Sequence, residues 1–275
     1  MTAPDSPRGR LEAAGAAILR SGRMIGALWG VWVGTWAGVI RRLGRRRDRA
    51  APRGELVRQL HDIGNRSLVF IAVTLGFIGM VMTYEACLQI GRVTGDYSQI
   101  GGQLLKLIVA DFGPTLAALM LATRVGAGIA AEIGSMKVTE QIDALRMSGV
   151  APIDYLIVPR FLASLVMTLV LTVIGGLVMY TAGGLTAKYS FGVNPGLFFD
   201  TGLVRGRHVA LLVIKAVSFG AAIPVVSGFC GLRARGSSEG VGWATTAAVI
   251  GSSFAVIALD FVISAAALFV TGGDL

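Results

Sequence analysis

Long apolar runs dominate this sequence and limit the folds that it can adopt. The clearest covers residues 161–187, which are 27 consecutive residues without a charged side chain. An α-helix needs about 20 apolar residues to cross the hydrocarbon core of a bilayer, because each residue advances it by about 1.5 Å. Four further runs exceed this length, at 68–90, 104–131, 209–230 and 243–270. The sequence therefore predicts an all-α membrane protein with about five transmembrane helices.

The distribution of charge divides the chain into two parts. Hydrophobic residues make up 54% and charged residues 15% of the 275, which is the balance of a membrane protein. The net charge is +9, and 13 of the 25 basic residues fall within residues 1–66, together with five acidic ones. This excess suits a cytoplasmic flank beside anionic lipid better than a nucleic-acid groove. We therefore expect a basic cytoplasmic N-terminal segment over 1–66 and a transmembrane domain over 67–275.

An uncharged run over residues 24–40 lies inside the basic segment. It contains Trp29, Trp32 and Trp36, and arginines flank it on both sides. Its 17 residues fall short of the usual span, whereas tryptophans with arginines at both ends are typical of a helix lying in the membrane interface. The run therefore predicts an interfacial helix, with a sixth span as the alternative.

The basic residues also predict the orientation of the spans. With the N-terminus inside, the cytoplasmic segments carry 18 basic residues and the external segments carry four. This asymmetry follows the positive-inside rule. It places the polar interval 132–160 and the loop 231–242 in the cytoplasm.

The interval 132–160 is the longest polar stretch between the apolar runs. Val138, Ile142 and Leu145 recur at helical spacing, which predicts a helix with one apolar face. Ser135 is the expected cap at its start and Gly149 at its end. A helix of about a dozen residues is marginal alone in water, so it needs something to dock against. The alternative is a solvated helix in the loop between two spans.

Several ionisable residues fall inside the apolar runs, where an unpaired charge costs several kcal/mol. Counted along their helices, Lys215 and Asp260 reach similar depths, which predicts a structural ion pair. A proton or substrate relay is the alternative. Glu85 and Asp111 lie toward the external ends of the first two spans. Glu85 either lines an internal cavity or reaches external water.

Small residues are dense within the first two spans. Gly76 and Gly79 lie in the first, and residues 126–134 hold three glycines and three alanines. Small side chains allow membrane helices to approach closely. We therefore expect tight helix packing over residues 126–134, where small residues are densest.

The sequence holds no motif that predicts catalysis. There is no glycine-rich loop of the Gly-x-x-x-x-Gly-Lys-Ser/Thr kind that would bind nucleotide phosphates. No group of histidine, cysteine and carboxylate residues has metal-ligand spacing. We therefore expect a protein that is not an enzyme and needs no cofactor.

The polar interval also carries a resemblance to a known family. Residues 131–142, AEIGSMKVTEQI, followed by Met147, Pro159 and Arg160, resemble the signature of the MlaE/YrbE permeases, the membrane subunits of MCE-type lipid ABC transporters. The likeness continues at Arg58, 76–80, 113–114, Arg124, 239–242 and 259–261, and it covers roughly residues 56–270.

This resemblance implies roles for particular residues. Residues 132–160, called the coupling segment below, would contain the helix that docks on a separate ATPase. The residues implied in that contact are Glu132, Lys137, Glu140, Gln141, Asp143, Leu145 and Met147. In the family, the first two spans line a lipid cavity near a dimer axis, and the corresponding candidates are Met82, Glu85, Gln89 and Asp111.

The function implied is that of a permease subunit in an ATP-driven transporter, moving phospholipid or another hydrophobic lipid between the inner membrane and the cell envelope. Its partners would be an ATP-binding cassette ATPase, an MCE-domain substrate-binding protein, a second copy of the chain and membrane lipids, with no nucleic acid. It would lie in the bacterial inner membrane as a multi-pass protein with its N-terminus in the cytoplasm. Two alternatives are an ion-coupled secondary carrier and a non-transporting membrane scaffold.

Overall fold

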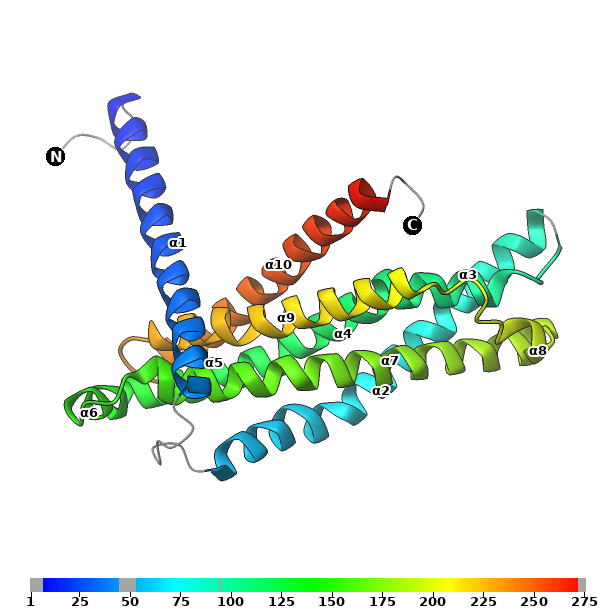
Figure 1. The fold of residues 1–275 in the computed structure, drawn as a ribbon. Coiled ribbons are helices and arrows are strands. Elements are labelled where there is room, and N and C mark those ends of the chain that lie inside the picture. Colours follow the sequence, from blue (N-terminus) through cyan, green and yellow to red (C-terminus); the bar gives the residue numbers. More distant parts are fainter. Residues whose placement is uncertain (1–6, 45–52, 94, 272–275) are drawn as a thin grey trace.

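The computed structural model describes residues 7–44, 53–93 and 95–271, and within these ranges every regular element is a helix (Figure 1). In chain order they are α1 (Pro7–Gly44), α2 (Arg53–Val93), α3 (Ile100–Leu107), η1 (Ile108–Phe112), α4 (Gly113–Leu121), η2 (Ala122–Gly126), α5 (Ala127–Val138), α6 (Gln141–Met147), η3 (Ile153–Ile157), α7 (Val158–Phe191), α8 (Pro195–Phe198), α9 (Gly206–Leu232) and α10 (Ser238–Thr271). The η elements are short π-helical turns.

Among the residues that the structure describes, five helical bodies are long and apolar enough to cross a membrane, as the sequence predicts. They are Gly54–Val93, Ile100–Val138, Ile153–Phe191, Gly206–Leu232 and Ser238–Val270. Each is longer than its apolar run, because the helix continues into polar residues at one or both ends. The chain is thus an all-α, multi-pass membrane protein.

Two of the π-helical turns have a cause in the sequence. η1 ends directly before Gly113 and Pro114, and η3 ends shortly before Pro159. Proline has no backbone N–H to donate and its ring crowds the preceding turn, so the helix widens there instead of breaking. The second body, Ile100–Val138, therefore remains one continuous helix that changes its pitch twice.

α2 and α7 pack against each other along most of their length. A Cβ atom added to Gly79 would lie 2.1 Å from the carbonyl oxygen of Met179, and one added to Gly183 would lie 2.3 Å from Oγ1 of Thr83. The two helices approach this closely only because these positions lack side chains. Close packing therefore occurs at Gly79, in the first of the two places where small residues are dense.

α1 crosses the bundle at a steep angle instead of running with the other helices (Figure 1). It is 38 residues long, so the helix expected over 24–40 is part of a longer one. Arg41 Nη2 donates to both carboxylate oxygens of Asp154, at 2.8 and 3.0 Å. Trp36 also packs edge-on against Phe161, with ring centroids 5.4 Å apart. The crossing agrees with a helix in the interface, and that placement stays a prediction.

The expected boundary at residue 66 falls inside α2, which passes through it without a break. Residues 53–66 form the start of this 41-residue helix, and the division into two segments at residue 66 stays a prediction. Residues 45–52 lie outside the described part of the chain. α6 and α8 lie at opposite ends of the bundle, so the loops between spans gather at two faces (Figure 1).

Candidate functional site

Three charged residues from three helical bodies meet inside the bundle. Lys215 of α9 is buried, and its Nζ lies 2.9 Å from Oδ1 of Asp260 on α10. The same Nζ also donates to Oδ1 of Asp111 on η1. Thr115 Oγ1 donates to Asp260 Oδ1 at 2.8 Å, and Ser264 Oγ to Asp111 Oδ1 at 3.3 Å. The lysine expected to pair with Asp260 alone is thus shared by two carboxylates.

A cavity of about 430 Å³ opens beside these charges. Its polar lining residues are Gln103, Lys106, Asp111 and Ser264, and the others are apolar side chains from α2, α3, η1 and α9. Of the four residues expected to line a lipid cavity, Asp111 is the one that lines this cavity. Met82 packs against the core, whereas Glu85 and Gln89 are exposed. Whether these three contact lipid stays a prediction.

Residues 135–149, which the sequence predicted as one helix, are divided between two. α5 runs on to Val138, and α6 begins only at Gln141. Glu140, between them, has φ +61°, in the left-handed region that residues other than glycine rarely adopt. Ser135 lies inside α5, so its expected role as the cap is wrong. Gly149, at φ +76°, does end α6, because its N–H bonds to the carbonyl of Arg146 at 3.0 Å.

An ion pair spans the turn between α5 and α6. Lys137 Nζ lies 2.9 Å from Oδ2 of Asp143, and Arg146 Nη1 lies 3.1 Å from Oδ1. The hydrogen bond from Lys137, with the charges of both basic residues, lowers the pKa of Asp143 below its ordinary value. Asp143 is therefore engaged inside the segment, and it stays ionised at neutral pH.

The apolar and polar faces of α6 are arranged as expected. Ile142 is fully buried and Leu145 is partly buried against the core. Glu140 and Gln141 are exposed, and Met147 is 87% exposed. α6 thus presents these three side chains away from the bundle at its end.

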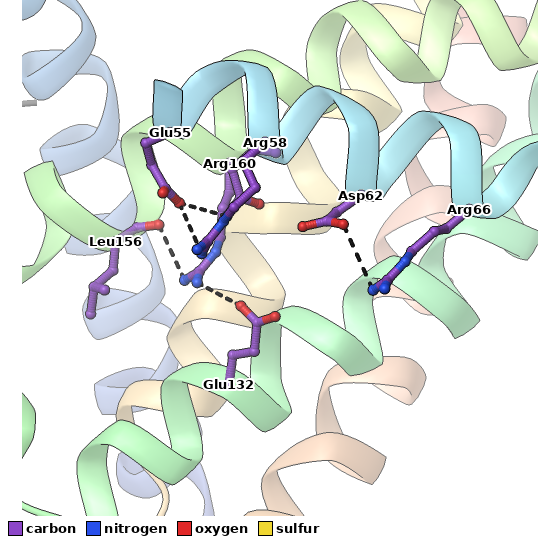
Figure 2. A network of polar contacts seen from close by, with 8 residues as sticks. Glu55, Arg58, Asp62, Arg66, Glu132, Leu156 and Arg160 are labelled. Atoms are coloured by element: carbon purple, nitrogen blue, oxygen red, sulfur yellow. Dashed lines mark hydrogen bonds and ion pairs between the residues drawn. The ribbon is translucent and has the colours of Figure 1, made fainter. Parts of the chain in front are cut away.

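The first and last residues of the coupling segment, Glu132 and Arg160, contact each other at the base of the segment, where it joins the bundle. Arg160 Nη2 donates to Oε2 of Glu132 at 2.7 Å, and Nη1 donates to the carbonyl of Leu156 at 3.3 Å (Figure 2). Glu55, on the first turn of α2, accepts from Arg58 at 3.4 Å and from Gln59 at 2.9 Å. Figure 2 shows Glu55 and Arg58 beside Arg160. The three helices α2, α5 and α7 therefore meet at this point.

Arg160 also begins a buried polar face on α7. Ser164, Thr168 and Thr172 follow at intervals of four residues, and all are at most 2% exposed. This face meets α9 where a Cβ on Gly220 would lie 3.0 Å from the carbonyl of Ser164. Close approach of α7 and α9 therefore relies on a glycine facing short polar side chains. The sequence shows the four-residue spacing of these side chains, but it does not show which helix their face contacts.

Sequence reasoning did not find two other contacts. Arg124 of η2 donates through Nη1 to Ser67 Oγ of α2 at 2.5 Å. Asp111 of η1 accepts from Lys215 of α9, a partner that the sequence did not reveal. Both contacts join residues more than 50 positions apart. A helix position gives the depth of a side chain but does not identify the neighbour that it faces.

Known proteins resemble this chain over most of its length. A family described as permease MlaE matches residues 56–266. A probable ABC transporter permease of Synechocystis sp. is 36% identical over 217 residues, which are 77% of this chain and 81% of the relative. The intermembrane phospholipid transport system permease protein MlaE of Haemophilus influenzae is 34% identical over 76% of this chain and 81% of the relative. The chloroplast protein TRIGALACTOSYLDIACYLGLYCEROL 1 of Arabidopsis thaliana is 34% identical over 76% of this chain and 60% of the relative.

The match covers all or nearly all of each of the five spans, and the whole coupling segment. It also includes the three charged residues inside the bundle and the Glu132–Arg160 contact. On this extent of similarity, the chain belongs to the MlaE permease family.

Proposed function

We propose that this chain is the permease subunit of an ATP-driven transporter that moves phospholipid or another hydrophobic lipid between the inner membrane and the cell envelope. The observation that carries this proposal is α6, a short helix that is anchored by its apolar face and exposes Glu140, Gln141 and Met147 at one end of a membrane-spanning bundle. In a member of the MlaE family, such a surface suits a separate subunit that hydrolyses ATP.

The proposed assembly has several parts. An ATP-binding cassette ATPase would dock on α6 from the cytoplasm. An MCE-domain substrate-binding protein would exchange lipid on the other side, and a second copy of this chain would complete the permease. The N-terminus would be cytoplasmic, which the distribution of basic residues supports. The names of the relatives, which include a phospholipid transport permease, support the lipid substrate.

The base of the coupling segment supports a mechanical role for it. Because Arg160 bonds Glu132 and lies beside the start of α2, a displacement of α6 would be carried to three spans together. A small shift at such a contact moves the neighbouring helices as well, because tightly packed helices can adopt only a few alternative arrangements. We infer that ATP-driven movement at α6 repositions α2 and α7, which pack closely along their length.

Reconstitution tests the proposal. The permease, with its ATPase and MCE-domain partner, is placed in liposomes that hold a labelled phospholipid, and transfer to acceptor vesicles is followed with ATP and with a non-hydrolysable analogue. We expect transfer only with ATP hydrolysis. Transfer that instead followed an imposed proton or sodium gradient would establish the ion-coupled carrier. Assembly with both partners but without transfer under either condition would establish the scaffold.

A further inference from the structure

The π-helical turn η3 is the last element of the coupling segment before α7. It is closed by a hydrogen bond from Val158 N to the carbonyl of Ile153, five residues back. Such turns are rare in helices and are frequent at functional positions. A movement of α6 that travels along the chain toward α7 passes through this turn, so the contacts that hold η3 decide how much of the movement arrives.

η3 packs against both α1 and α9, and each of these helices approaches it through a glycine. On α9, a Cβ added to Gly228 would lie 2.8 Å from Cδ1 of Ile157. On α1, a Cβ added to Gly38 would lie 2.5 Å from Oδ1 of Asp154 and 2.7 Å from Cγ2 of Val158. Any larger side chain at Gly38 would push α1 away from η3.

The contact with α1 continues on both sides of Gly38. One turn earlier, a Cβ added to Gly34 would lie 3.2 Å from Cδ1 of Ile153. At the other end, the Arg41 guanidinium donates to both carboxylate oxygens of Asp154. These two side chains are 54% and 36% exposed, and an ion pair this exposed contributes little to stability. Breaking it should therefore release η3 from α1 without unfolding the bundle.

We propose that α1 holds η3 in place during transport, with Gly38, Arg41 and Asp154 as positioning residues. α1 also reaches the start of α7, where Trp36 packs on the buried Phe161. Because η3 is held by α1 and α9 together, a displacement at α6 moves α7 as one body; without α1, η3 takes up part of that displacement itself. The inference rests on the proposed transport function, in which it gives α1 a part.

Hydrogen exchange on the full-length chain in detergent tests the positioning itself. We expect Gly38→Leu and Arg41→Asp to speed the exchange of the backbone amides of residues 153–158 about fivefold relative to the wild-type chain. Gly30→Leu is the matched control, because it makes the same change in the same helix where no described atom lies within 4 Å of the added Cβ. It should leave the exchange of these amides unchanged.

Reconstitution with the ATPase and the MCE-domain partner tests the consequence for transport. Arg41→Asp and Asp154→Arg should each keep ATP hydrolysis but lower the lipid transferred per ATP hydrolysed about fivefold, at the low end of usual couplings between sites. The double variant restores the ion pair with its charges exchanged and should recover most of that ratio. A merely structural role would instead lower hydrolysis and transfer together, through loss of folded complex.

The possible results separate this inference from the proposed function. Unchanged exchange over residues 153–158 in Gly38→Leu and Arg41→Asp, or an unchanged ratio of transfer to hydrolysis in the charge variants, would overturn the inference and leave α1 as a membrane anchor only. Failure of the double variant to recover the ratio would also count against it. Absence of ATP-dependent transfer by the wild-type chain would count against the proposed function, and the exchange measurement would still decide whether α1 holds η3. If Gly38→Leu does not fold, the charge variants decide.

Discussion

Glu132 and Arg160 form an ion pair in which the two partners have opposite surroundings. The Arg160 side chain is 7% exposed and that of Glu132 is 62% exposed, although Nη2 and Oε2 are only 2.7 Å apart. The carboxylate can return to water when the pair is broken, but the guanidinium cannot. The stability of this end of the bundle therefore depends more on the presence of Glu132 than the exposure of that residue suggests.

This asymmetry predicts unequal effects of removing each partner. Glu132→Ala leaves a buried cation that keeps the hydrogen bond to the Leu156 carbonyl and the nearby charge of Glu55, and we expect it to lower the free energy of unfolding by about 3 kcal/mol. Arg160→Met leaves an exposed carboxylate and should cost about 1 kcal/mol. Thermal unfolding of the purified variants in detergent compares them. A larger loss for Arg160→Met would mean that packing of the arginine, and not its charge, holds this contact.

The shared lysine predicts a specific order of effects among the membrane charges. Lys215→Met leaves Asp111 and Asp260 close to each other without a cation, whereas Asp260→Asn leaves a neutral pair. We expect the first to be the more destabilising, by several kcal/mol. Adding Asp260→Asn to Lys215→Met should then recover part of the loss, so the double variant is less destabilised than the sum of the two single effects. Unfolding measurements that add fully would show that the residues do not interact.

If α1 lies in the interface, as the sequence predicts, both of its ends face the cytoplasm. A cysteine in place of Arg23, an exposed position in α1, should react with an impermeant thiol reagent only after the cells are opened. A cysteine in place of Thr201, in the loop expected outside, should react in intact cells and is the positive control. Reaction of the Arg23 variant in intact cells would instead establish a sixth span.

Gly79 sets the distance between α2 and α7. Because an added Cβ would meet the backbone oxygen of Met179 at 2.1 Å, the helices must separate to accept alanine. We expect Gly79→Ala to lower the free energy of unfolding by about 2 kcal/mol. Gly128→Ala is the matched control, because nothing lies within 4 Å of its added Cβ and alanine favours a helix. Equal unfolding temperatures for the two variants would contradict the close packing.

The fold follows from the sequence further than the site does. A run of more than 20 apolar residues leaves a membrane helix as its only stable form, so each span was predictable. The widened turns η1 and η3 follow from Pro114 and Pro159, but the break at Glu140 has no such signal, because its φ of +61° occurs at a residue that normally favours a helix. The contact of Asp111 with Lys215 depends on how two helices are rotated about their axes, and apolar periodicity in nearly uniform apolar runs does not determine that rotation.

The coupling role proposed for α6 makes the most direct prediction about function. Glu140 is exposed, none of the interactions described above involves its side chain, and its backbone conformation is as strained for lysine as it is for glutamate. Glu140→Lys should therefore change stability by less than about 0.5 kcal/mol. Like charges brought together at an interface, by contrast, can cost several kcal/mol. We expect this variant to insert normally into the membrane, to lose co-purification of the ATPase and to lose lipid transport.

Three further variants separate the charge of Glu140 from its backbone and from the packing of α6. Glu140→Gly relieves the left-handed strain and removes the charge without reversing it, so it should weaken ATPase binding less than lysine does. Leu145→Asp places a charge against the core and should lower the amount of protein instead. Asp62→Lys reverses a charge on α2 away from α6 and should leave ATPase binding unchanged. The measurement is a pull-down of the ATPase at matched permease levels, and full retention by Glu140→Lys, with transport intact, would make α6 a solvated loop helix without a coupling role at this residue.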